Sequence, residues 1–184
     1  MRIVAGAWRG RALSAPSGDA TRPTADRVRQ ALFDRLLHAP WAGRAAIDGA
    51  RVLDAFAGTG ALGLEALSRG AGYATFLEIG RAALTALRAN VAACRAEACC
   101  TVLPADALRP PPGQACGLLF LDPPYGQDLV APALNALQAA GWIAPDALIV
   151  AELGRDDALP RPDPVDDRIQ GAARVVVWRM GSAK

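Results

Sequence analysis

The chain has 184 residues, 52% of them hydrophobic, and its formal net charge is only +2. No stretch approaches the roughly 20 consecutive apolar residues of a membrane-spanning helix, and no apolar run of the signal-peptide kind follows Met1, which favours a cytoplasmic globular protein with a proper core. The four cysteines form no C-x-x-C pair and have no histidine nearby, so the sequence predicts no metal site and small, mostly buried thiols.

The charge is distributed unevenly along the chain. Residues 1–44 carry eight arginines and three aspartates, a net charge of +5, whereas the remainder carries −3. A basic segment on a nearly neutral body is typical of an arm that contacts phosphates, and a solvated basic face is the alternative. We expect one domain over residues 1–184, with a basic N-terminal extension at 1–44 and the core at 45–184.

The first predicted elements belong to this extension. Residues 2–13 favour a short strand pair, because small apolar runs flank two glycines. A helix is predicted over 24–37, with Thr24 as its N-cap and His38, the only histidine, at its end. The apolar face of this helix comprises Val28, Ala31, Leu32, Phe33 and Leu36.

From residue 51 onward, strands and helices alternate, which is the pattern of a doubly wound α/β fold. The proline-rich stretch at 110–113 predicts a loop in place of a helix, and 154–167 a surface loop. The predicted strands lie near 51–57, 73–78, 100–104, 117–122, 147–152 and 174–180, and the predicted helices near 61–69, 81–95 and 127–140.

A glycine-rich turn follows the first of these strands. Gly58, Gly60 and Gly63 match G-x-G-x-x-G, which by itself is weak support for a dinucleotide site. Asp54, just before the turn, would oppose a pyrophosphate but suits a ligand with a cationic portion, such as S-adenosylmethionine. Glu78, at the end of the next strand, can accept hydrogen bonds from both hydroxyls of a ribose.

The apolar run at 117–121 ends abruptly in Asp122, Pro123, Pro124 and Tyr125, the DPPY segment. Because ligands of open α/β sheets bind at the carboxyl ends of the strands, this segment is a candidate site. The prolines cannot extend the sheet, so a carboxylate and free carbonyls remain as acceptors beside an aromatic face. Such a segment suits a planar base that carries an exocyclic NH2.

Taken in order, these motifs resemble the RsmD family, which methylates the exocyclic amine of one guanine in bacterial small-subunit ribosomal RNA. The resemblance extends over nearly the whole chain. It rests on residues 2–11, 22–33, 54–60 and 60–70, on Glu78 and Asp106, and on the DPPY segment. It implies a Rossmann-like class I methyltransferase with a mostly parallel seven-stranded sheet, an antiparallel last strand paired with residues near 165–170, and a small N-terminal hairpin and helix.

The resemblance also implies the roles of individual residues. The predicted catalytic set is Asp122, Pro123, Pro124 and Tyr125, which would hold and stack on the target base. The predicted S-adenosylmethionine-binding set is Asp54, Phe56, Gly58, Gly60, Glu78, Asp106 and Ala107. The predicted RNA-binding set is Arg2, Trp8, Arg9, Arg11, Arg22, Thr24 and Arg27. The chain departs from the family at Gly80, where an acidic residue is common.

Other functions fit parts of the pattern. One alternative is an amine methyltransferase acting on DNA adenine or cytosine or on a protein glutamine, and another is a non-catalytic RNA-binding assembly factor or a degenerate dehydrogenase. The expected partner is 16S ribosomal RNA, within an assembling small subunit, and the expected state is a monomer. The sequence leaves open the exact target nucleotide, the need for a particle, and whether Asp122 accepts a proton or only positions the amine.

Overall fold

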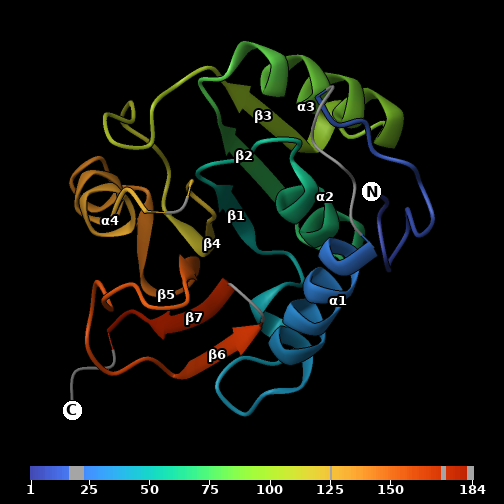
Figure 1. Cartoon of the computed structure of the whole chain (residues 1–184). Helices are drawn as coiled ribbons and strands as arrows, with labels where there is room; N and C mark the ends of the chain where they lie inside the picture. The colour runs from blue at the N-terminus through green and yellow to red at the C-terminus, as the bar shows by residue number, and fades with distance from the viewer. Residues whose placement is uncertain (17–22, 125, 171–172, 182–184) are drawn as a thin grey trace.

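The computed structural model describes residues 1–184 except 17–22, 125, 171–172 and 182–184. Its centre is a seven-stranded sheet of order β3-β2-β1-β4-β5-β7-β6 (Figure 1). The strands are β1 (Arg51–Asp54), β2 (Tyr73–Leu77), β3 (Cys100–Leu103), β4 (Cys116–Leu121), β5 (Ile143–Gly154), β6 (Asp166–Gln170) and β7 (Ala173–Arg179). The helices are α1 (Pro23–His38), α2 (Ala61–Ser68), α3 (Arg81–Cys94) and α4 (Val130–Ala139), with short 3-10 turns at Arg44–Ala46 and Glu97–Cys99.

The first five strands pair in parallel, and β7 pairs antiparallel with both β5 and β6. This arrangement confirms the Rossmann-like class I methyltransferase fold and the predicted hairpin at the end of the chain. Parallel strands direct all their carboxyl ends to one edge of the sheet, so the residues after β1, β2, β3 and β4 share that edge.

Two apolar layers cover the sheet (Figure 1). On one face α1, α2 and α3 pack on alternate residues of the central strands, and the Phe33 ring lies 5.6 Å from the Phe120 ring. On the other face α4 packs on the intervening residues together with Trp142, whose Nε1 donates to the Pro111 carbonyl at 2.8 Å. The proline stretch near Pro111 thus replaces a helix on this face, as the sequence predicted.

Several predicted boundaries were wrong for local reasons. The helix α1 begins at Pro23, whose fixed φ suits the first helical position, so Thr24 lies inside the helix and is not its N-cap. The expected strand pair at 2–13 is present as a short antiparallel hairpin, in which the bridge between Arg2 and Ala12 is flanked by backbone hydrogen bonds from the Ile3 N–H to the Arg11 carbonyl at 2.9 Å and from the Leu13 N–H to the Met1 carbonyl at 3.0 Å. The helix α4 starts only at Val130, because Asp128 has a positive φ of 49°.

Buried polar contacts hold the N-terminal extension on α2. Glu65 is fully buried, and its carboxylate accepts from the backbone N–H groups of Val4 and Ala5 at 2.8 and 3.0 Å. The same carboxylate forms ion pairs with Arg69 at 2.8 Å and Arg29 at 3.5 Å. The extension is therefore attached to the helix that follows the glycine turn, and its first residue also reaches the turn, where Met1 Sδ lies 3.9 Å from Thr59 Oγ1.

Candidate functional site

The turn between β1 and α2 brings bare backbone to the carboxyl edge of the sheet. Gly58 and Gly60 have positive φ angles of 53° and 77°, which L side chains rarely adopt. A Cβ atom at Gly60 would lie 2.3 Å from Leu87 Cδ1, whereas no described atom lies within 4 Å of a Cβ at Gly58. The backbone conformation of Gly60 thus favours glycine, a Cβ there would also displace the Leu87 side chain, and Gly58 leaves open space where a ligand can approach.

Asp54 is buried at the end of β1, and its Oδ2 accepts from the Gly63 N–H at 3.0 Å. It thereby caps the first turn of α2, whose N-cap residue Gly60 has no side chain to do so. The pKa of Asp54 is raised to about 8, chiefly by burial and further by the charges of Asp122 and Glu78, against the lowering effect of the Gly63 hydrogen bond. A cationic ligand beside this carboxylate would offset part of that cost.

Glu78, just after β2, fixes the backbone around the turn. Its Oε2 accepts from the Gly58 N–H at 2.8 Å, and its Oε1 accepts from the N–H groups of Ile79 and Gly80 at 2.8 and 2.6 Å. A carboxylate has about four acceptor positions, so a ribose hydroxyl would share it with these donors. A Cβ at Gly80 would lie 3.0 Å from Glu78 Oε1, so a side chain there would crowd this carboxylate.

A shallow pocket joins four predicted cofactor residues. Phe56, Glu78, Asp106 and Ala107 line it. Asp106 Oδ1 also accepts from the Leu108 N–H at 2.9 Å, so this carboxylate both caps its turn and faces the pocket. Beyond these four, the pocket is lined by Ala55, Leu77, Ile79 and Ala105. Its polar ends and apolar walls suit a nucleoside, whose ribose needs acceptors and whose base needs apolar cover.

Sequence reasoning missed Ile79 in this pocket. Ile79 is 66% exposed, which is unusual for a large apolar side chain beside a run of buried strand residues. The signal was its position directly after Glu78, where an apolar side chain would cover a base if the Glu78 carboxylate bound the ribose of the same nucleoside.

Asp122 lies directly after β4, at the same edge of the sheet. Burial, followed by the charge of Glu152, raises the pKa of Asp122 to about 7, a direction that favours the protonated acid. The side chain keeps an exposed surface, so water screens part of this effect. Pro123 is buried, Pro124 is exposed, and Tyr125 lies outside the described residues. The predicted stacking role of Tyr125 stays a prediction.

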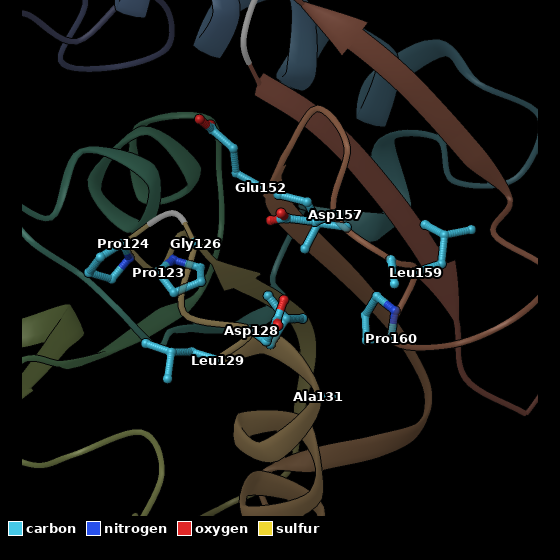
Figure 2. Close-up of a pocket in the computed structure, with 13 residues that line it drawn as sticks. Pro123, Pro124, Gly126, Asp128, Leu129, Ala131, Glu152, Asp157, Leu159 and Pro160 are labelled. Atoms are coloured by element: carbon cyan, nitrogen blue, oxygen red, sulfur yellow. The ribbon is translucent and has the colours of Figure 1, made fainter.

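A second pocket lies beside the DPPY segment, between α4 and the loop after β5 (Figure 2). Pro123 and Pro124 form one side, and Leu159 and Pro160 form another. Glu152 also borders the pocket, but its carboxylate points away from Leu159 and Pro160 (Figure 2). Sequence reasoning missed Glu152, because only the register between β4 and β5 brings it next to Asp122.

The predicted RNA-binding residues are exposed to different degrees. Arg2, Arg9 and Arg27 are exposed, while Trp8 is half-buried and packs against the core, so its ring is only partly available for stacking. Arg11 is exposed, but its guanidinium donates to the Ala93 carbonyl at the end of α3. Arg22 and the side chain of Thr24 lie outside the described part of the chain.

The structure also bears on the expectations about the cysteines, metal-binding side chains and membrane-spanning helices. Cys94, Cys100 and Cys116 are buried and Cys99 is half-buried, as predicted for packing residues. Within the described ranges, no three His, Cys, Asp or Glu side chains gather as a metal site requires. Of the helices that the structure describes, none is long and apolar enough to cross a membrane.

The strand order, the glycine turn after β1 and the acidic side chains after β1, β2 and β4 define a Rossmann-like methyltransferase that uses S-adenosylmethionine. The chain belongs to the family described as Conserved hypothetical protein 95, which matches residues 1–178. The Ribosomal RNA small subunit methyltransferase D of Escherichia coli (strain K12) is 40% identical over 162 residues, covering 87% of this chain and 78% of that protein.

Solved structures agree with this assignment. The Escherichia coli protein yhhF has a TM-score of 0.85 and 36% identity, covering 100% of this chain and 99% of that chain. A Thermus thermophilus 16S rRNA N2 methyltransferase, solved with AdoMet and guanosine, has a TM-score of 0.63 at 20% identity and covers 89% of this chain and 44% of that chain. At that identity the second likeness shows the fold alone.

Proposed function

We propose that the protein transfers the methyl group of S-adenosylmethionine to the exocyclic N2 amine of a guanine in small-subunit (16S) ribosomal RNA. The observation that carries the proposal is the position of Asp122 and the two prolines at the carboxyl edge of the sheet, where the charge of Asp122 acts on Asp54 beside the glycine turn. Similarity to the Escherichia coli small-subunit methyltransferase D supports the choice of RNA.

The predicted cofactor residues lie in two parts of the site, one for the methionine portion of S-adenosylmethionine and one for its ribose and adenine. Asp54 would face the cationic methionine portion, with Gly58 and Gly60 allowing close approach. Glu78 would hold the ribose. Phe56, Asp106 and Ala107 would enclose the adenine in the pocket that they line. When bound, S-adenosylmethionine supplies an electrophilic methyl group on a positively charged sulfur.

Asp122 would act on the amine. The nitrogen lone pair of a guanine amine is delocalised into the ring, so the amine is a poor nucleophile. The ionised Asp122 carboxylate and the Pro123 carbonyl would accept its two hydrogens and favour a pyramidal nitrogen, while Pro124 and Tyr125 support the base. A nitrogen–carbon bond forms, the carbon–sulfur bond breaks, and one amine proton leaves to Asp122 or water. Catalysis is then mainly positioning and electrostatics.

The remaining assignments concern the RNA. Exposed Arg2, Arg9 and Arg27, with Arg11, Arg22, Thr24 and Trp8, would contact the backbone and the displaced strand, because a base in folded RNA must leave its stack to reach Asp122. We further propose a single-domain cytoplasmic monomer that acts on an assembling subunit. A small extension offers little surface of its own, so ribosomal proteins would complete the binding site.

The test is methylation with tritiated S-adenosylmethionine. Small-subunit particles from cells that lack the enzyme are incubated with wild type or Asp122→Asn, and the RNA is digested to nucleosides. We expect label in N2-methylguanosine with wild type and a loss of at least about 100-fold with Asp122→Asn. Label in another nucleoside would discard the guanine assignment. Equal labelling of protein-free RNA would discard the requirement for a particle.

A further inference from the structure

Glu152 occupies a position that the cofactor site does not explain. The register pairs Leu121, the last residue of β4, with Ala151 on β5, so Asp122, directly after β4, lies next to Glu152 on β5, and the two carboxyl groups interact electrostatically. Phe120 and Val150, which precede Asp122 and Glu152 by two residues, both pack in the core cluster on one face of the sheet. The side chains of Asp122 and Glu152 therefore project from the same face of the sheet.

The backbone of Glu152 is held from both sides. Its strand pairs with β4 through Ala151, and Glu152 itself is the register partner of Val175 on β7. Figure 2 shows the carboxylate directed away from Leu159 and Pro160. The side chain thus stands on a rigid strand, beside the group proposed to hold the methyl-accepting amine.

Two carboxylates side by side on neighbouring strands repel each other and destabilise a sheet. The consequence is visible in Asp122, whose pKa is raised by burial and by the charge of Glu152. Functional sites are where such unfavourable pairs recur, and a ligand with two adjacent N–H donors would relieve the repulsion.

The Watson–Crick edge of guanine carries two such donors, the N2 amine and the adjacent N1–H. Adenine and cytosine instead place an unprotonated ring nitrogen beside their amine, and its lone pair would face a carboxylate. An enzyme that flips a base reads this edge by hydrogen bonds. Because Asp122 is assigned the amine, its neighbour on the next strand is placed to meet the ring nitrogen.

We propose that Glu152 accepts the N1–H of the target guanine and thereby selects guanine over bases whose ring nitrogen is an acceptor. The inference rests on the proposed methylation of a guanine amine and adds the residue that determines specificity. Selection works in both directions, since the carboxylate stabilises guanine and repels the lone pair of a competitor.

The sharpest probe is 2-aminopurine, which keeps the exocyclic 2-amine but has an unprotonated N1. The methylated nucleotide is first mapped with wild type, and particles are then reconstituted with guanine or 2-aminopurine at that position. We expect wild type to prefer guanine in kcat/KM by about 10- to 100-fold. This comparison needs no variant, and a wild type that methylates both bases equally would overturn the inference.

The variant Glu152→Gln supplies the second half of the test. A glutamine amide can accept from guanine N1–H or donate to the 2-aminopurine ring nitrogen, so the preference should fall to within about 3-fold of unity. Cofactor binding should match wild type, and the melting temperature should not fall, because the substitution removes the repulsion between the two carboxylates. If Glu152 acted only on the pKa of Asp122, both substrates would show the same shift in pH profile and the preference would persist, which would refute the proposal.

The matched control is Asp157→Asn. Asp157 lies near the end of the same strand and accepts from the Gly154 N–H at 2.7 Å, a bond that an asparagine oxygen can keep. The substitution removes one negative charge from the same region but leaves Asp122 and Glu152 unchanged. The preference for guanine should therefore stay at the wild-type value. Failure of wild type to methylate any guanine would instead contradict the proposed function itself.

Discussion

The buried carboxyl of Asp54 makes the stability of the protein depend on pH. Its pKa rises from 3.8 in the unfolded chain to about 8 in the folded one. The folded state therefore binds the proton more tightly, and the contribution is fully favourable below the unfolded pKa. As the pH rises from about 4 to about 8, the unfolded chain ionises freely while the folded one does not, so stability declines across this window.

We expect Asp54→Asn to raise the melting temperature of the cofactor-free protein at pH 8 by a few degrees, since ~1 kcal/mol corresponds to about 2–4 °C at this size. The amide keeps an acceptor for the Gly63 N–H but does not ionise. The gain should shrink as the pH falls and vanish below about pH 4, where wild-type Asp54 becomes protonated in both states. Thermal melts across this range measure it.

The same substitution should weaken binding of S-adenosylmethionine, because the anion that faces its cationic portion is gone. A stabilised protein with weaker cofactor binding is the expected trade-off at a functional site. Calorimetric titration with the cofactor provides the second readout. A gain in melting temperature that is the same at every pH would show that burial of the charge is not its cause.

Asp122 makes a different prediction, about rate. The amine is held by the ionised carboxylate, and the raised pKa of about 7 means that this form is lost as the pH falls through neutrality. We expect kcat/KM to drop about tenfold for each pH unit below the apparent pKa. Because Asp122 and Glu152 interact, that value belongs to the pair. Asp122→Asn should flatten the profile, and a flat wild-type profile between pH 5.5 and 8.5 would contradict the assignment.

At the scale of helices and strands, the sequence predicts most reliably which residues lie at the carboxyl ends of the parallel strands. Asp54, Glu78 and the DPPY segment were found because parallel strands deliver their last residues to one edge, whatever the detailed packing. Glu152 was missed because its role depends on the register of two strands. The start of α1 was misplaced because Thr24 is a good capping residue, yet Pro23 suits the first helical turn equally well.

Asn90 is another element-level feature that periodicity does not reveal. It is a buried polar residue on α3, and its amide nitrogen donates at 2.9 Å both to the Ser14 carbonyl and to the Thr59 carbonyl in the glycine turn. Its oxygen accepts from the Ser14 N–H at 2.7 Å. One side chain thus joins Ser14 of the N-terminal extension, which is 76 positions from Asn90 in the sequence, to the cofactor turn.

We expect Asn90→Ala to lower the free energy of unfolding by about 1–3 kcal/mol, because three backbone groups lose their partner. It should also raise KM for S-adenosylmethionine several-fold, since the Thr59 carbonyl is no longer oriented. Ser68→Ala is the matched control, because Ser68 holds the extension through Ala5 and Trp8 without contacting the turn. Equal effects of both variants on KM would show that only loosening of the extension matters.

At the scale of the whole molecule, the charges must suit two ligands of opposite charge, a cationic cofactor and an anionic RNA. The carboxyl edge of the sheet collects Asp54, Glu78 and Asp122, which suits a cationic cofactor but repels RNA. The extension at residues 1–44 carries the opposite charge, +5, and Asn90 joins its Ser14 to the Thr59 carbonyl in the glycine turn at that edge. Phosphate attraction by the extension can therefore bring RNA to a site whose own charge would exclude it.

This division of charge predicts how RNA affinity responds to salt. Replacing exposed Arg2 or Arg9 with alanine should weaken binding to small-subunit particles and reduce the slope of log K against log salt by about 0.7–0.9 for each phosphate that is no longer neutralised. Arg88→Ala, on the exposed side of α3, removes the same charge from the body and should leave the slope unchanged. Binding isotherms at several salt concentrations measure this. Equal slope changes in all three variants would mean that RNA responds to overall charge and that the extension is a solvated basic face.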